Sequence, residues 1–179
     1  MHYADDDTSS IRSLLAMRSP SIAIGLVLGV LLSFVTSRFE EVLSHDIRVA
    51  FFIPFIVYVA AAVGAQTENI YVRDLRSGRA SFKKYLVKET ILGIILGALS
   101  SVVSAMVTML WFGSMELTMV VSTAMFFTVT IAPLVALLVT EVLQLEHKDP
   151  AVGSGPIATV IQDTLSVLIY GLVASAILF

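Results

Sequence analysis

Residues 86–112 read LVKETILGIILGALSSVVSAMVTMLWF, and this stretch decides the class of fold. After Glu89 it carries no charged side chain. A helix rises 1.5 Å per residue, so a stretch of this length crosses the hydrocarbon core of a bilayer, which is about 30 Å thick. The whole chain agrees: 57% of its 179 residues are hydrophobic and only 14% are charged, against about 25% charged in a soluble domain. We therefore expect an integral membrane protein.

Four more apolar stretches, separated by polar breaks, flank this one. In chain order, the expected spans are 21–37, 47–66, 86–112, 117–143 and 156–179. All five must be helices, because a few isolated strands cannot close into a barrel that satisfies their backbone groups in lipid. The expected fold class is all-α, with five transmembrane helices. Residues 1–20 lack the apolar core of a signal peptide and are expected to form a short cytoplasmic tail.

Lysine and arginine are distributed unevenly over the segments that join the spans. If the N-terminus is inside, nine of them fall in inner segments and two, Arg38 and Arg48, in outer ones. Because positive residues favour the cytoplasmic side, we expect the N-terminus inside and the C-terminus outside. The basic connection 73–88 could bind nucleic acid, but a topology signal in contact with lipid headgroups is the favoured interpretation.

Catalysis has little support in this sequence. No cysteine is present, which excludes disulfides, thiolate metal sites and thiol nucleophiles. His2, His45 and His147 all fall outside the expected spans, so no Ser-His or paired metal-ligand arrangement forms within the membrane. We therefore expect a protein that is not an enzyme and that needs no cofactor.

Small residues recur at four-residue intervals on two spans. Such residues share one helix face and allow a neighbouring backbone to approach closely. We expect both faces to pack against other helices, although the serines could instead line a polar path. The residues are Gly25, Gly29, Ser33 and Ser37 on the first span, and Gly93, Gly97, Ser101 and Ala105 on the third.

A carboxylate inside an apolar span is the strongest functional signal. Asp163 lies seven residues after Pro156, about 10 Å along the fifth span. No basic residue occurs at comparable depth in any span, and a charge there is costly unless it is paired or hydrated. We expect Asp163 to face a wet cavity and to bind a cation. The alternative is a protonated acid that bonds a neighbouring helix.

A second polar cluster, Gln66, Thr67, Glu68 and Asn69, ends the second span. In the expected topology it lies at the depth where the fifth span begins, so the two could converge on one inner-mouth site. Its carboxylate, amide and hydroxyl oxygens suit hard divalent cations. The alternative is an ordinary interfacial helix end, in which Glu68 pairs with a nearby basic residue.

Other carboxylates lie nearer the expected membrane surfaces. Glu89 and Glu141 lie near the inner boundary, where they can pair with Lys88 and Lys148. On the outer side, an acidic group could form a vestibule that concentrates cations, or could simply be solvated. The members of that group are Glu40, Glu41 and Asp46.

Three segments also carry a resemblance to a known family. They are Ile53-Pro54-Phe55 with Val63-Gly64-Ala65-Gln66-Thr67, then Lys88-Glu89, and finally Ser154-Gly155-Pro156 with Asp163 and Leu168-Ile169-Tyr170. Together they resemble the membrane domain of the MgtE-type magnesium transporters, which are related to the animal SLC41 carriers. The resemblance covers the chain from about Ser21 to its end.

The resemblance implies a homodimer of five-helix subunits, with a pore on the dimer axis lined chiefly by the second and fifth helices. It implies that Asp163 holds a largely hydrated Mg²⁺, and that oxygens of Thr159 and Gly155 contribute one and two turns earlier. Mg²⁺ suits such a site because it gives up its waters reluctantly. The expected function is transport of a divalent cation, Mg²⁺ first, across the cell membrane by a homodimeric channel or carrier.

Departures from the family pattern leave alternatives open. Ala60-Ala61-Ala62 stand where Gly-Gly-Asn is usual, Gly155 stands where asparagine is common, and Glu68 replaces a small residue. Mn²⁺, Co²⁺ and Ca²⁺ therefore remain alternative ions. An exchanger coupled to Na⁺ or H⁺ and a non-transporting membrane subunit remain alternative functions. The expected module, 21–179, lacks the N-terminal helical and CBS domains of many relatives, so a separate regulatory protein could gate it.

Overall fold

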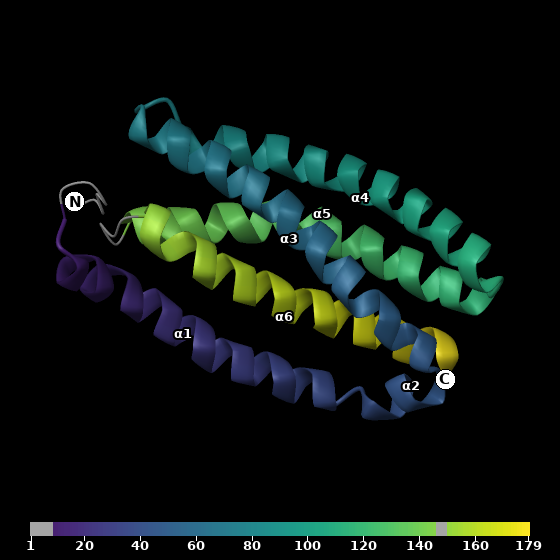
Figure 1. Ribbon diagram of the computed structural model, residues 1–179. Coiled ribbons are helices and arrows are strands. Elements are labelled where there is room, and N and C mark those ends of the chain that lie inside the picture. Colours follow the sequence, from purple (N-terminus) through teal and green to yellow (C-terminus); the bar gives the residue numbers. More distant parts are fainter. Residues whose placement is uncertain (1–8, 146–149) are drawn as a thin grey trace.

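The computed structural model describes residues 9–145 and 150–179, with the side chains of 150–154 and 156 left undescribed. Lys148, expected near the inner surface, lies outside these residues. The described chain consists of helices joined by short turns, and its long helices run alternately up and down, so that α1 begins and α6 ends at opposite ends of the bundle (Figure 1). The elements are α1 (Ile11–Ser37), α2 (Glu40–His45), α3 (Ile47–Arg76), α4 (Phe82–Phe112), α5 (Met115–Leu145) and α6 (Pro150–Leu178).

Five of these helices are long and apolar enough to cross a membrane, which confirms the five expected spans. Two of them extend well beyond the continuous apolar stretches that predicted them. α1 begins at Ile11 rather than at residue 21, capped by the Ser10 hydroxyl, which accepts a hydrogen bond from the Ser13 amide at 3.3 Å. α3 continues to Arg76, ten residues beyond its expected end. Residues 11–20 are therefore part of a helix rather than of a tail.

The centre of the bundle is α5, which packs against α3, α4 and α6 and supplies more of the described buried residues than any other helix. Its contact with α4 depends on two glycines. A Cβ added at Gly93 would collide with the Thr130 carbonyl, and one at Gly97 would lie 2.7 Å from the Phe126 carbonyl. The close approach expected for this face of the third span is confirmed.

The small-residue face of α1 behaves differently. α1 packs mainly on α6, and a Cβ at Gly25 would only touch Val160 at 3.9 Å. At Gly29 a Cβ would meet no atom within 4 Å. An open, mostly apolar groove of about 550 Å³ runs between the two helices along this face. The expected tight packing is therefore not made by α1 in this chain.

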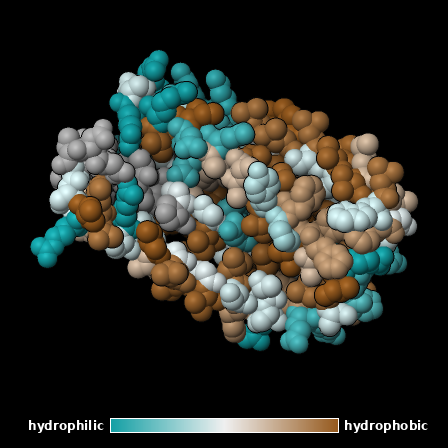
Figure 2. Space-filling model, in the orientation of Figure 1, coloured by the Kyte–Doolittle hydropathy of each residue, from teal (hydrophilic) through white to brown (hydrophobic). Residues whose placement is uncertain are grey.

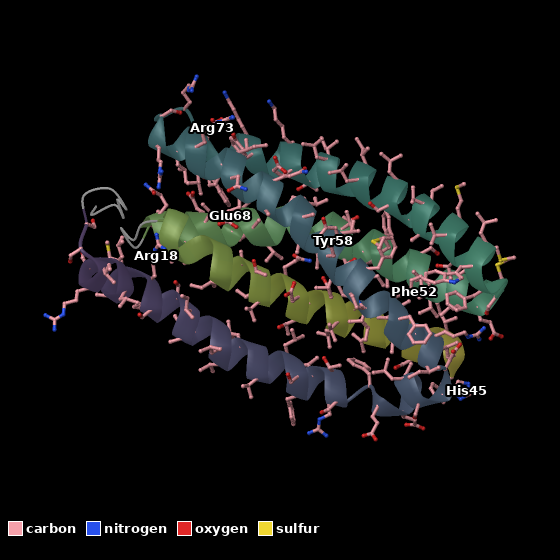
Figure 3. The ribbon with its side chains drawn as sticks, in the orientation of Figure 1. Arg18, His45, Phe52, Tyr58, Glu68 and Arg73 are labelled. Atoms are coloured by element: carbon pink, nitrogen blue, oxygen red, sulfur yellow. The ribbon has the colours of Figure 1, made fainter. Side chains whose placement is uncertain are left out.

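Apolar side chains cover the outside of the bundle, and charges gather at its ends. On the face in Figure 2, hydrophilic residues lie toward the two ends and hydrophobic residues between them. Exposed apolar residues such as Leu110, 84% exposed, suit contact with lipid rather than water. Figure 3 shows Arg18 and Arg73 at one end and His45 at the other. The uneven distribution of charge along the sequence therefore becomes a difference between the two ends of the bundle.

The end that holds α2 is ordered by polar contacts. Asp46 caps α3 by accepting from the Arg48 amide at 3.0 Å, and its Oδ2 pairs with Arg48 Nη2 at 2.7 Å. The hydrogen-bonded Arg48 side chain lowers the pKa of the Asp46 carboxyl below its ordinary value. Nearby, the Tyr170 hydroxyl donates to the Val49 carbonyl at 2.8 Å, which fastens α6 to the first turn of α3.

Candidate cation site

α6 presents the three expected ligand positions along one unbroken helix. Gly155, Thr159 and Asp163 follow one another at four-residue intervals, so each step is about 6 Å along the axis. Thr159 is exposed, whereas Gly155 and Asp163 are partly buried. These three positions therefore lie at the surface of a single subunit.

The carboxylate of Asp163 has an incomplete set of partners. Its Oδ1 is buried and forms no hydrogen bond with any residue that the structure describes. A carboxylate oxygen withdrawn from water without a donor is costly, and more so inside an apolar helix. This geometry leaves the oxygen open to a partner outside the described residues, such as an ion, water or another chain.

The polar cluster at the inner end of α3 divides between two helices. Thr67 is buried and donates to Glu89 Oε2 on α4 at 2.7 Å. Glu68 faces α6 instead, and its Oε1 lies 3.5 Å from the position that a Cβ would take at Gly155. Gln66 and Asn69 are exposed. Glu68 is therefore the residue of this cluster that approaches α6.

The carboxylates expected near the inner surface are also turned inward. Glu89 is only 8% exposed and accepts a hydrogen bond from Thr67 on α3, so the expected pairing with Lys88 is wrong: Glu89 lies on the same face of α4 as Gly93 and Gly97, which packs against α5. Glu141 on α5 accepts a hydrogen bond from the Tyr71 hydroxyl. Thr67 and Tyr71 lie four residues apart and so share one face of α3. That face is hydrogen-bonded to Glu89 on α4 and to Glu141 on α5.

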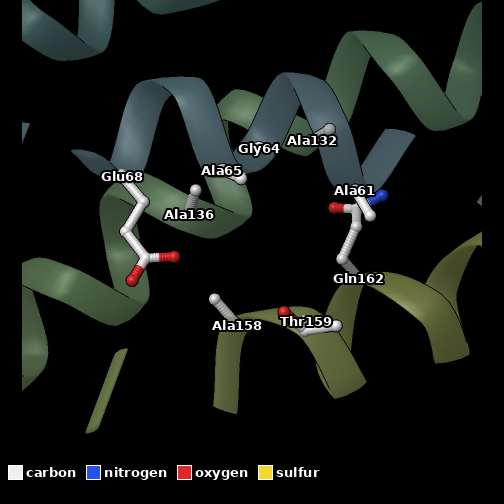
Figure 4. A pocket seen from close by; sticks show the side chains of 9 residues that line it. All are labelled: Ala61, Gly64, Ala65, Glu68, Ala132, Ala136, Ala158, Thr159 and Gln162. Carbon is white, nitrogen blue, oxygen red and sulfur yellow. The ribbon is translucent and has the colours of Figure 1, made fainter. Parts of the chain in front are cut away.

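A small cavity lies among α3, α5 and α6, beside the three expected ligand positions of α6 (Figure 4). Its volume is about 20 Å³, and three polar side chains, Glu68, Thr159 and Gln162, contribute to its lining. The remaining wall consists of Ala61, Gly64, Ala65, Ala132, Ala136 and Ala158. Gln162 is a residue that the sequence reasoning missed. An amide adjacent to Asp163 within an apolar span was the available signal.

The expected outer vestibule lies at the opposite end of the bundle from Glu68. Glu40 and Glu41 are exposed in the first turn of α2. Asp46, in contrast, is occupied by the α3 cap and by Arg48. Of the three residues expected to form the vestibule, Glu40 and Glu41 are therefore the ones that face solvent.

Within residues 9–145 and 150–179, no three His, Asp or Glu side chains come together in a group able to cage a metal ion. The described part of a single subunit thus offers single carboxylates on separate helices, Asp163 on α6 and Glu68 on α3, rather than a cluster of acids. Such a donor set suits an ion that keeps water ligands, or a site completed by a second chain.

Fold and site together define a multi-pass membrane protein whose interior carries acidic, oxygen-rich positions on α3 and α6. The sequence model of the MgtE family, described as "Divalent cation transporter", matches residues 53–173. This chain belongs to the MgtE family. Members of the family are transporters, so the expectation that the chain is not an enzyme is confirmed.

Curated relatives agree with this assignment. The chain is 30% identical over 162 residues to the magnesium transporter MgtE of Bacillus subtilis, covering 89% of this chain and 36% of the relative. The corresponding protein of Enterococcus faecalis is 30% identical over 161 residues, covering 88% and 36%. That of Thermus thermophilus is 29% identical over 165 residues, covering 88% and 35%. The chain spans about a third of the length of these relatives.

Proposed function

We propose that this chain carries a divalent cation, Mg²⁺ first, across the cell membrane as a homodimer whose pathway is bordered by α3 and α6. The observation that carries the proposal is the buried Oδ1 of Asp163, which has no hydrogen-bond partner within the described part of the chain. Family membership supports it, because the relatives are magnesium transporters. Thr159 and Gly155 would supply oxygens one and two turns away on the same helix.

The charge of the ion is the reason for proposing a second copy of the chain. One Asp163 neutralises half the charge of a divalent ion, and the described residues gather no further acids around it. Two copies related by a two-fold axis would place two such carboxylates on opposite sides of one pathway. Mg²⁺ fits a site of this kind because it retains its waters and is held through them.

The proposed orientation has the basic end of the bundle in the cytoplasm. That end holds Arg18, Arg73 and the basic start of α4, and positive residues favour the inner side. The membrane potential then drives inward flux, with about 2.3 kcal/mol per charge per 100 mV, doubled for a divalent ion. An ion leaving the pathway on this side would pass Glu68.

The test is divalent-cation flux into proteoliposomes, comparing the native chain with Asp163→Asn. A matched control is Glu116→Gln, which removes a carboxylate from the exposed first turn of α5. We expect flux in the native chain and the control, and its loss in Asp163→Asn while dimers persist on size-exclusion chromatography. Equal flux in all three proteins would refute a role for Asp163. Flux that depends on a Na⁺ or pH gradient at clamped voltage would indicate exchange, and no flux in any protein would favour a non-transporting subunit.

A further inference from the structure

Tyr58 exposes a hydroxyl near the middle of a membrane-spanning helix. The residue is 73% exposed, and its hydroxyl forms no hydrogen bond with any residue that the structure describes. Figure 3 shows it on α3 between Phe52 and Glu68, away from the charged ends of the bundle. Tyrosine in membrane proteins is enriched at the bilayer surface, where its hydroxyl reaches water. A hydroxyl without a hydrogen bond is costly in hydrocarbon, so this position favours contact with water rather than with lipid.

Two contacts fix how α3 and α6 are aligned along the bundle. The two helices run in opposite directions (Figure 1). Toward one end, the Tyr170 hydroxyl of α6 donates to the Val49 carbonyl of α3 at 2.8 Å. Toward the other end, Glu68 Oε1 of α3 lies 3.5 Å from the position that a Cβ would take at Gly155 of α6. These two pairs of residues therefore set the levels of the segments between them.

Tyr58 and Asp163 lie at the same level between these two pairs. Along α6, Asp163 is seven residues from one anchoring residue and eight from the other. Along α3, Tyr58 is nine residues from one anchoring residue and ten from the other. Each lies within one residue, about 1.5 Å of axial rise, of the midpoint of its segment. The exposed hydroxyl and the incompletely bonded carboxylate thus belong to one depth of the bundle.

The side of α3 that carries Tyr58 borders α6 and faces away from the core. Ile56 and Ala60 are fully buried, and Tyr58 lies about 200° around the helix from each of them. Ala61 and Ala65 follow three and seven residues later, so they share the side of Tyr58. Both line the cavity beside α6 (Figure 4). Tyr58 therefore occupies the outward edge of α3 on the side of α6.

We propose that Tyr58 lines the cation pathway at the level of Asp163, where its phenol oxygen accepts hydrogen bonds from the waters of a passing ion. The inference rests on the proposed function and adds to it a polar residue from the other helix that borders the pathway. Mg²⁺ retains its waters, and these present their hydrogens outward, so acceptor oxygens on the wall can recognise them. A phenol supplies such an acceptor without adding charge.

The first test measures access of water to this position. The chain contains no cysteine, so a single cysteine can be placed in an otherwise unreactive protein. We compare Tyr58→Cys, Thr159→Cys and Phe127→Cys in proteoliposomes with a charged, water-soluble methanethiosulfonate reagent. Phe127, an exposed aromatic residue within α5, is the matched control for a position that faces lipid. Because the thiolate is the reactive form and apolar surroundings suppress it, the first two should react at least about tenfold faster than the control.

The outcomes separate this inference from the proposed function. Reaction of Thr159→Cys without reaction of Tyr58→Cys would overturn the inference and leave the proposed pathway standing. Lack of reaction at both positions would also overturn it, and flux through the native chain then decides separately whether the protein transports cations. Reaction of Phe127→Cys as fast as that of Tyr58→Cys would show that the labelling does not report a pathway, and the inference would lose its support.

The second test addresses the hydroxyl itself. Tyr58→Phe keeps the ring and removes the oxygen, and it should fold because the side chain is exposed. We expect the Mg²⁺ concentration for half-maximal flux to rise about two- to tenfold, as for the loss of one hydrogen bond. Phe127→Leu should leave that concentration unchanged. A merely structural effect would lower the amount of folded protein without moving the half-maximal concentration, and an unchanged concentration in Tyr58→Phe would refute the role of the hydroxyl.

Discussion

The hydrogen bond from Thr67 to Glu89 should stabilise the inner half of the bundle and orient α3. It joins α3 to α4 at 2.7 Å, and both side chains are buried. Thr67 and Glu68 are neighbours on a helix, about 100° apart around its axis. Holding Thr67 toward α4 therefore turns Glu68 toward α6, where it meets the cavity. Losing the bond should affect both stability and the position of Glu68.

The magnitude follows from the burial of Glu89. A hydrogen bond to a charged group contributes about 1.5–3 kcal/mol, and removing one partner leaves the other desolvated. Thr67→Val keeps the shape of the side chain and removes the donor, so we expect it to lower the free energy of unfolding by about 1.5–3 kcal/mol. Thr67→Ser keeps the hydroxyl and should cost less than about 1 kcal/mol, mainly for one lost methyl group.

The assay is reversible unfolding in mixed micelles, analysed as a double-mutant cycle between Thr67→Val and Glu89→Gln. We expect a coupling energy of about 1 kcal/mol or more, as for residues in direct contact. Thr90→Val is the matched control, because the Thr90 hydroxyl bonds only the Leu86 carbonyl of its own helix. That control should change stability by less than about 0.5 kcal/mol. A coupling energy near zero would refute the assignment of this bond as an inter-helix clamp.

Three other expectations follow from the described contacts. Gly97→Ala should destabilise by about 1–3 kcal/mol through overpacking, whereas Gly29→Ala, which meets nothing within 4 Å, should be close to neutral in the same unfolding assay. The lowered pKa of Asp46 means that its pairing with Arg48 stabilises the fold above the unfolded pKa of about 3.9 and that this stability is lost as pH falls through the folded pKa. Asp46→Asn should therefore flatten the acid limb of a plot of unfolding midpoint against pH. Glu68→Ala should change the ranking of Mg²⁺, Mn²⁺, Co²⁺ and Ca²⁺ in flux measurements, and an unchanged ranking would exclude Glu68 from ion selection.

Hydropathy predicted the five spans because a helix that crosses the bilayer needs an apolar stretch as long as the hydrocarbon core is thick. Such stretches can be read directly from the sequence. It could not predict where α1 begins or α3 ends. Beyond the membrane a helix needs only backbone bonds and a cap, which Ser10 supplies to α1, so no continuous apolar run is required there. The six-residue α2 was missed for the same reason, since its acidic first turn resembles a solvated loop.

The site divides along a similar physical line. Asp163 was predictable because an unpaired charge in an apolar span is too costly to be incidental. Gln162 carries no charge, and a buried amide can form hydrogen bonds with many kinds of partner, so the sequence alone does not single it out. The structure shows that its nitrogen donates to Thr128 and Ser166, whereas its oxygen has no partner among the described residues.

The directions of Thr67 and Glu68 show why a cluster in sequence is not a cluster in space. Both belong to one polar run, and pattern alone assigned them to one inner-mouth site. In the structure, successive residues point about 100° apart, so Thr67 reaches Glu89 on α4 whereas Glu68 points toward Gly155 on α6. Which neighbour lies on which side follows from tertiary packing, in particular from the glycines that draw α4 onto α5. The sequence can therefore name the polar residues of a membrane site, but the helix packing decides which of them act together.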